Sequence, residues 1–472
     1  MKGDFSRLTF DPRKQFTRVL MQQGRVQLDA DWNEQGAILL HYLRTLAADL
    51  IGPFGGPESG LGFAVEAVSD GGGRVADLKI GPGRYYVDGL LCENLEEALY
   101  FKQAHLPLDP EKEKLPDVPF LVYLDVWERH VTFVDDDGIR EVALGGPDTA
   151  TRAQVVWQVR TAAELPAGSP EDPGWPAAED WRQWVERRQP ANRGSLKARA
   201  KIGGDDTNPC VASPDARYRG TENQLYRVEI QREERGPAAA DGTAGTTAAL
   251  TFKWSRENGS VVFPVLGFAG ETATLEHLGR DEATGLKRGD WVELADDDSE
   301  AGARSWSLLR VEAVDAARSS VTLKPAEDDD DPTLPVYEEG EVQRKHAVLR
   351  RWDHRASAAP KTGPKPRGAV LVVFPKDPPK PDEGWVALED GIEIQLQPGI
   401  YRPGDYWLIP ARTATGDVEW PGTTEDPEAV PPHGVEHRYA PLALRLGRTA
   451  ATAGGGLRDL RKEFKPLGLP AA

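Results

Sequence analysis

Residues 120–129 read FLVYLDVWER, a strongly apolar run that is typical of a buried strand. Strand patterns continue on both sides of it. Upstream, the turn sequence GPG at 81–83 leads into RYYVDG, and downstream residues 154–160 place alternate apolar side chains on one face. We therefore predict a β domain over residues 54–165.

The second half of the chain shows the same two-residue period. Apolar and polar side chains alternate over residues 225–230 and again over 250–255, which predicts a pair of hairpin strands. The dipeptide Asn258-Gly259 then predicts a tight type I′ turn. Further short strands with brief connections predict a small SH3-like barrel at about 265–325.

The glycine and proline content favours many short elements over a helix bundle, since the chain has 48 Gly and 38 Pro in 472 residues. The predicted fold class is mainly β, with several small antiparallel β domains of sandwich or SH3-like barrel type and one N-terminal α-helix. The predicted parts are an N-terminal docking arm (1–24), a strand plus amphipathic helix (25–53), β domain 1 (54–165), a linker or surface excursion (166–220), β domain 2 with the barrel (221–345), β domain 3 (346–447) and a peripheral C-terminal tail (448–472).

The one long helix is predicted directly after the arm. Residues 25–30 alternate in a way that predicts a short strand, and Asp31 can then cap a helix, with Glu34 completing a capping box. Apolar or small positions follow at 4-3-4-3-4 spacing, namely Trp32, Gly36, Leu39, Leu43, Leu46 and Leu50. This stripe can pack on the chain's own sheet or on a copy of itself. We expect packing within the chain, because fewer than three heptads are short for an independent coiled coil.

The first residues are basic and aromatic in a chain that is otherwise acidic. Such an arm either docks on another molecule or wraps over the chain's own first β domain, and the sequence leaves both open. The side chains that we single out as an assembly interface are Phe5, Phe10, Arg13, Phe16, Leu20 and Trp32.

The charge balance limits the possible partners. With 57 Lys and Arg against 76 Asp and Glu, the net charge is −19. Such a surface repels phosphate backbones, so we expect no nucleic-acid partner. No apolar run approaches the roughly 18 residues that cross a bilayer, and the N-terminus has no apolar segment of a signal peptide. We therefore expect no transmembrane segment, no signal peptide and assembly in the cytoplasm.

Sequence motifs of high catalytic specificity are absent: no P-loop, GxGxxG after a strand, GxSxG or HExxH is present. His433 and His437, and the acidic runs at 135–137, 296–298 and 328–331, offer cation ligands but lack zincin or EF-hand spacing. Two cysteines 118 positions apart build neither a disulfide framework nor a zinc cluster. We expect no catalytic residues, no metal and no cofactor.

Long stretches resemble a family of bacterial proteins of unassigned domain function. The similar segments are 1–35 (MKGDFSRLTFDPRKQFTRVLMQQGRVQLDADWNEQ), 139–160 (IREVALGGPDTATRAQVVWQVR), 218–230 (YRGTENQLYRVEI), 252–262 (FKWSRENGSVV), 349–354 and 401–421 (YRPGDYWLIPARTATGDVEWP). Members of that family tend to be encoded beside phage-tail-like contractile injection systems. The resemblance implies a setting, a tail-like particle, and carries over no catalytic residue.

We therefore expect a non-enzymatic structural or accessory component of such a particle, near its baseplate or as a peripheral appendage, which can be released with an extracellular particle. Its expected partners are other particle subunits, and symmetric copies would make it a homo-oligomer. One alternative is a fibre-like module that binds cell-surface glycans through exposed Trp and Tyr side chains, for which Trp407 or Trp420 would be the position to substitute. Another is a secreted cargo hydrolase, which would show an open cleft holding a close carboxylate pair or a His–carboxylate pair.

Overall fold

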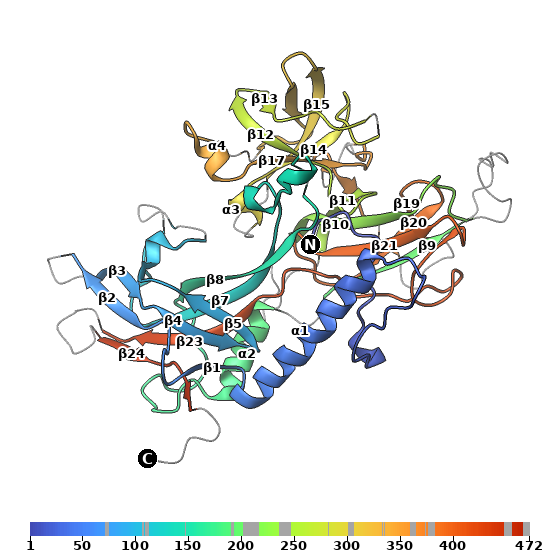
Figure 1. Cartoon of the computed structure of the whole chain (residues 1–472). Helices are drawn as coiled ribbons and strands as arrows, with labels where there is room; N and C mark the ends of the chain where they lie inside the picture. Colours follow the sequence, from blue (N-terminus) through green and yellow to red (C-terminus); the bar gives the residue numbers. More distant parts are fainter. Residues whose placement is uncertain are drawn as a thin grey trace.

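The structure is a computed structural model of the whole chain (Figure 1). It describes all residues except 71–74, 106–107, 109–112, 147, 190–192, 202–216, 236–246, 282, 301–305, 333, 335, 359–364, 373, 376–382, 448–455 and 466–472. Cys210 and most of the glycine- and alanine-rich stretch between the two predicted hairpin strands lie outside the described residues.

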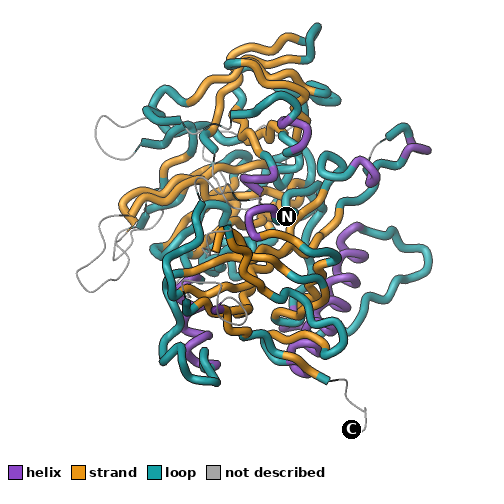
Figure 2. The backbone as a smooth tube through the Cα atoms, turned by 90° about the vertical axis from the view of Figure 1, so that its left-hand side faces the viewer, coloured by secondary structure: helices purple, strands orange, loops and turns teal. Residues whose placement is uncertain are grey.

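The chain is mainly β, as predicted, with several antiparallel sheets and one long N-terminal helix. Figure 2 shows strands at every level of the molecule, from the barrel at the top to the sheets below. They form three groups, each with its own buried core.

The first group joins early strands to the end of the chain. Its three sheets have the orders β25-β1-β4-β5, β24-β23-β7-β8 and β2-β3-β6. The bounds are β1 (Phe54–Pro57), β2 (Val65–Ser69), β3 (Val75–Ile80), β4 (Gly83–Val87), β5 (Leu90–Asn94), β6 (Ala98–Leu99), β7 (Phe120–Val131), β8 (Arg152–Ala162), β23 (Arg438–Arg445), β24 (Leu457–Asp459) and β25 (Glu463–Phe464). The segment expected to be a peripheral tail instead pairs through β24 and β25 with strands of this group.

The second group contains the predicted hairpin. β10 and β11 pair in antiparallel register, with Val228 opposite Trp254, and this confirms the prediction. Asn258 and Gly259 have φ of 51° and 66°, and the Ser260 amide donates to the Glu257 carbonyl at 3.0 Å, so the predicted tight turn is also present. The bounds are β9 (Ser195–Ala200), β10 (Gln224–Arg235), β11 (Thr247–Ser255), β18 (Val370–Leu371), β19 (Val386–Ala387), β20 (Ile392–Gln397), β21 (Tyr406–Arg412) and β22 (Asp417–Val418).

The third group is a closed barrel with the order β12-β13-β16-β15-β14-β17. Its bounds are β12 (Val262–Ala269), β13 (Thr272–Leu275), β14 (Trp291–Ala295), β15 (Leu308–Asp315), β16 (Ser320–Pro325) and β17 (Val348–Trp352). The barrel lies where it was predicted but extends further along the chain. β17 lies in the segment for which the sequence predicts a third β domain, yet it closes the barrel by pairing with both β12 and β14.

The helical elements differ from expectation in one place, residues 25–28. They are α1 (Asp29–Ile51), α2 (Ala178–Arg188), α3 (Asp297–Glu300), α4 (Glu341–Arg344) and the 3-10 turns η1 (Pro12–Lys14), η2 (Tyr100–Lys102), η3 (Asp137–Ile139) and η4 (Val142–Leu144). Residues 25–28 form no strand, so that prediction is wrong: alternation needs a neighbouring strand to supply hydrogen bonds, and Val26 here is 83% exposed. A short helix at 180–188 within the linker is expected from the sequence and is present as α2, whose Trp184 is fully buried.

α1 runs along the outside of the molecule from the β21 region to β1 (Figure 1). Its C-terminal part contacts β1 and β4, and Arg44 forms an ion pair with Glu128 of β7 at 2.6 Å. Gly89 permits this approach, because a Cβ there would lie 2.1 Å from the Arg44 carbonyl oxygen. None of the described helices is long and apolar enough to cross a membrane.

Candidate interaction surface

α1 turns its large apolar side chains away from the rest of the chain. Trp32 is 82% exposed, and the four leucines of the predicted stripe, Leu39, Leu43, Leu46 and Leu50, are 54–62% exposed. The fully buried residues of the helix are Ala30 and Ile38. The expectation that the stripe packs on the chain's own sheet is therefore wrong, because the inward face carries Ala30, Ile38 and mostly small, polar or charged side chains instead.

The first nine residues dock on their own chain, chiefly on the second strand group. The N-terminal amine donates to the Tyr406 hydroxyl at 2.8 Å, and the Asn258 amide donates to the Gly3 carbonyl at 2.8 Å. Arg7 pairs with Glu419 at 3.0 Å. These residues contact chiefly the second strand group and not the first β domain, over which the arm was one of the two options expected to wrap. Docking of the arm on another molecule stays a prediction.

Beyond this docked part the arm is open to solvent. Ser6 and Thr9 hydrogen-bond Asp29 and Glu34 of α1, and the chain then makes an excursion before the helix begins. Along this excursion the apolar side chains Phe16, Leu20, Met21 and Val26 are all more than half exposed.

The structure divides the six predicted interface residues into three groups. Phe5 and Phe10 are half-buried, with ring centroids 6.1 Å from His130 and 5.7 Å from His41 respectively. Arg13 is exposed and pairs with the neighbouring Asp11 at 3.0 Å. The exposed apolar set is Phe16, Leu20 and Trp32.

Exposed apolar side chains concentrate in this part of the molecule. Fourteen of the twenty-two large apolar side chains that are exposed among the described residues belong to residues 1–50. We call the exposed side chains of residues 8–28 together with the outer face of α1 the arm–helix surface. Large apolar side chains gathered on the surface of a soluble protein commonly mark an interaction site.

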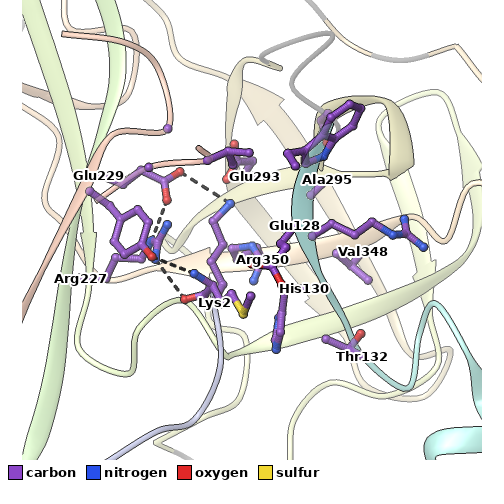
Figure 3. A pocket seen from close by; sticks show the side chains of 18 of the residues that line it. Lys2, Glu128, His130, Thr132, Arg227, Glu229, Glu293, Ala295, Val348 and Arg350 are labelled. Atoms are coloured by element: carbon purple, nitrogen blue, oxygen red, sulfur yellow. Dashed lines mark hydrogen bonds and ion pairs between the residues drawn. The ribbon is translucent and has the colours of Figure 1, made fainter. Parts of the chain in front are cut away.

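A cleft of about 640 Å³ lies where the arm, β7, the barrel and β10 meet (Figure 3). Its inner wall is a buried charge network around Glu229, whose carboxylate is 2.6 Å from Arg227 Nε, 3.4 Å from Lys253 Nζ and 3.7 Å from Lys2 Nζ. Burial opposes ionisation, but these three cations outweigh it and hold the pKa of Glu229 well below its usual range. The carboxylate and the three cations of this wall are thus paired with one another.

A second cluster lies in the same cleft. Ligand atoms of Asp135, Asp297 and His346 all lie within 4.8 Å of one another, so together they could hold a cation. His346 Nδ1 is 3.0 Å from Asp297, and Arg129 Nη1 is 3.5 Å from Asp297 and 3.9 Å from Asp135. The guanidinium therefore already balances the acidic charge. Burial raises the pKa of Asp297.

The histidines that the sequence singled out serve separate contacts. His437 Nδ1 is 2.7 Å from the buried carboxylate of Asp125, which Arg160 also pairs at 3.1 Å. His433 packs against the ring of Tyr406 with centroids 5.4 Å apart.

Residues 1–169 and 162–448 match the model of DUF6519, a family of unknown function. The chain belongs to this family. No curated protein and no solved structure matches it significantly. The family description names no activity, partner or particle, so the link of this DUF6519 member to contractile injection systems stays a prediction.

Sequence reasoning missed part of both sites. The spacing of the α1 leucines predicts a stripe but does not say that it faces solvent. The stripe also does not include Leu40 and Tyr42, which are exposed beside it. In the cleft, the acidic runs at 135–137 and 296–298 were each weighed alone. The fold brings one aspartate from each run to His346, a residue that no spacing in the sequence connects to them.

Proposed function

We propose that the chain is a non-enzymatic structural or accessory subunit of a phage-tail-like contractile injection particle, and that it joins other subunits through the arm–helix surface. The observation that carries this proposal is the concentration of exposed apolar side chains in residues 1–50. Burying such side chains against a partner is the main favourable term in protein association. The family resemblance supports the particle as the setting, with assembly in the cytoplasm.

The charges around the arm indicate the kind of partner. Arg13, Lys14, Arg18 and Arg25 are exposed in the same stretch of chain as Phe16 and Leu20, whereas the chain as a whole is acidic. A basic rim around apolar anchors fits an acidic surface, which steers association and fixes the orientation of the two partners. The proposed partner surface is therefore apolar at its centre and acidic at its margin.

A double substitution in the exposed arm tests the proposal. Phe16→Asp with Leu20→Asp places charges at the expected contact and removes no buried side chain, so the chain should fold normally. We expect particles purified on a density gradient from producing cells to contain the wild-type chain and to lose at least nine-tenths of the variant. The matched control is Val142→Asp with Leu144→Asp, two exposed positions outside the surface. Equal incorporation of all three chains would refute the proposal.

The two tryptophans named for the glycan-binding alternative are not exposed. Trp407 is buried in the core of the second strand group, and Trp420 is half-buried with its indole N–H donating to the Glu428 carbonyl at 2.9 Å. Among the described tryptophans, the exposed one is Trp32, which belongs to the arm–helix surface.

The cargo-hydrolase alternative has one specific observation in its favour, the His346–Asp297 pair in the cleft. A panel of model ester, peptide and glycoside substrates tests it with the wild type and His346→Gln. Turnover that the variant loses would establish a hydrolase, and equal background rates in both proteins would exclude the pair from catalysis of these reactions.

A further inference from the structure

We infer that a second copy of this chain covers the outer face of α1, packed antiparallel across a two-fold axis near His41. The inference rests on the proposed function and deepens it, because it names the partner of the helical part of the arm–helix surface. The other part of the arm–helix surface, the exposed side chains of residues 8–28, is left for other subunits.

The exposed face of α1 is complementary to itself when the helix is reversed. All the positions concerned are exposed, and none of their side chains is needed by the core of its own chain. Reversal about His41 pairs Trp32 with Leu50, Gly36 with Leu46, and Leu39 with Leu43. An interface across a two-fold axis requires this kind of self-complementary patch.

The sizes of the side chains favour the antiparallel orientation over the parallel one. In a parallel pair each residue meets its own counterpart, so two Gly36 residues would leave a gap and two Trp32 residues would crowd the next layer. In the antiparallel pair every layer of the stripe sets a leucine against Trp32, Gly36 or another leucine. This spreads volume evenly, as close packing requires.

Gly36 is an independent observation that points to a close neighbour from outside the chain. Glycine inside a helix stabilises the helix less than alanine does. An ideal Cβ built at Gly36 has no atom of the chain within 4 Å apart from its near neighbours, so alanine would fit there. Its φ is not positive either. Nothing in the described chain therefore requires glycine at this position, whereas a partner's Leu46 would need the space that it leaves.

The exposed area suits a stable pair. The outward side chains of α1 together expose on the order of 800 Å², which is roughly what each partner buries in a standard protein interface. Figure 1 shows α1 on the outside of the molecule. The arm contacts the helix at Glu34, Gln35 and His41, none of which belongs to the stripe.

Molar mass in solution tests the pairing. By light scattering at about 50 μM, we expect the wild type at twice the chain mass of 51.7 kDa. Leu43→Asp should give the single-chain mass with an unchanged circular dichroism spectrum. The control Leu95→Asp, at a position 87% exposed elsewhere, should stay at twice the chain mass. A single-chain mass for the wild type, a trimer or larger species, or a Leu43→Asp protein that still pairs would overturn the inference.

Gly36→Leu separates a fitted interface from general stickiness. The new leucine side chain has room within its own chain and adds exposed apolar area. If the chains associated only by non-specific apolar contact, this variant would therefore associate more strongly than the wild type. The antiparallel pair predicts instead at least a tenfold weaker dimer, because the new side chain meets the partner's Leu46. A dimer of unchanged or greater strength would contradict the proposed layers.

Cysteine cross-linking tests the orientation. In a Cys210→Ser background, where the remaining Cys92 is buried, Trp32→Cys and Leu50→Cys chains are oxidised separately and as a mixture. The antiparallel pair predicts a disulfide between the two variants in the mixture and none within either variant alone. Cross-linking of each variant with itself would show a parallel pair and overturn the orientation. The particle test changes Phe16 and Leu20 of the arm, whereas the dimer tests change residues of α1. A failure of particle incorporation can therefore be told apart from a failure of dimerisation.

Discussion

At the scale of single residues, the cleft holds distant parts of the chain together through charge. Glu229 of β10 contacts Lys2 of the arm and Lys253 of β11, and Lys253 reaches Glu293 of the barrel at 2.7 Å. A buried network of this kind contributes little net free energy while intact. Removal of one member is costly, because the remaining charges stay buried without compensation.

Glu229→Gln should therefore destabilise the fold by about 3 kcal/mol. The substitution leaves Lys2, Arg227 and Lys253 around a neutral amide. Denaturant unfolding followed by tryptophan fluorescence measures the loss. Glu97→Gln serves as the control, since Glu97 pairs with Lys79 at the surface with its side chain 58% exposed, and it should cost under about 1 kcal/mol. Equal effects of the two variants would contradict the role given to the network.

Glu257 makes stability depend on pH in a definite direction. Burial, and then the charge of Asp353, raise its pKa from 4.5 to about 7 against the opposing effects of Arg351 and Arg256. The folded chain therefore binds this proton more tightly than the unfolded chain does. The resulting stability is fully present below pH 4.5 and is lost as the pH rises through 7.

We expect the wild type to lose about 2 kcal/mol relative to Glu257→Gln between pH 4.5 and pH 8. Unfolding curves of both proteins across that range provide the measurement, and their difference isolates this residue from every other titrating group. A difference that does not change with pH, or changes with the opposite sign, would show that the carboxyl titrates normally.

At the scale of elements, periodicity and turn residues predict those strands, turns and helices that depend on nearby residues alone. The strand at 120–129, the β10–β11 hairpin with its Asn258-Gly259 turn, and the long helix were all found from periodicity and turn residues. α2 was not assigned to a core, because proline and glycine surround it. Yet Trp181 and Trp184 stack with centroids 4.8 Å apart against the β7–β23 sheet, and only the fold supplies that partner.

Trp184→Ala should cost about 4 kcal/mol, since it removes a fully buried ring and leaves a cavity. Thermal unfolding gives the change. Gln183→Ala on the exposed side of the same helix should be nearly neutral, because alanine is a good helix former and the side chain is exposed. If Trp184→Ala also proved neutral, α2 would be part of a linker, as its composition suggested.

At the scale of the whole molecule, the fold class was predictable and the arrangement of the parts was not. Each sheet of the first group that contains β1 or β7 takes strands from both ends of the chain, and the barrel takes β17 from beyond its predicted end. Pairing between distant strands leaves no trace in local periodicity. The same limit applies to the candidate surface, because a leucine stripe looks identical in sequence whether its own sheet or another chain covers it.

The central claim is that other subunits cover the arm–helix surface, and hydroxyl-radical footprinting of the arm tests it most directly. The reactivity of Phe16, Leu20 and Met21 is compared between the free chain and the chain within purified particles, with Leu95 and Val142 as exposed references. We predict at least fivefold protection of the arm in the particle and little change at the references. Equal reactivity of the arm in both states would contradict the account.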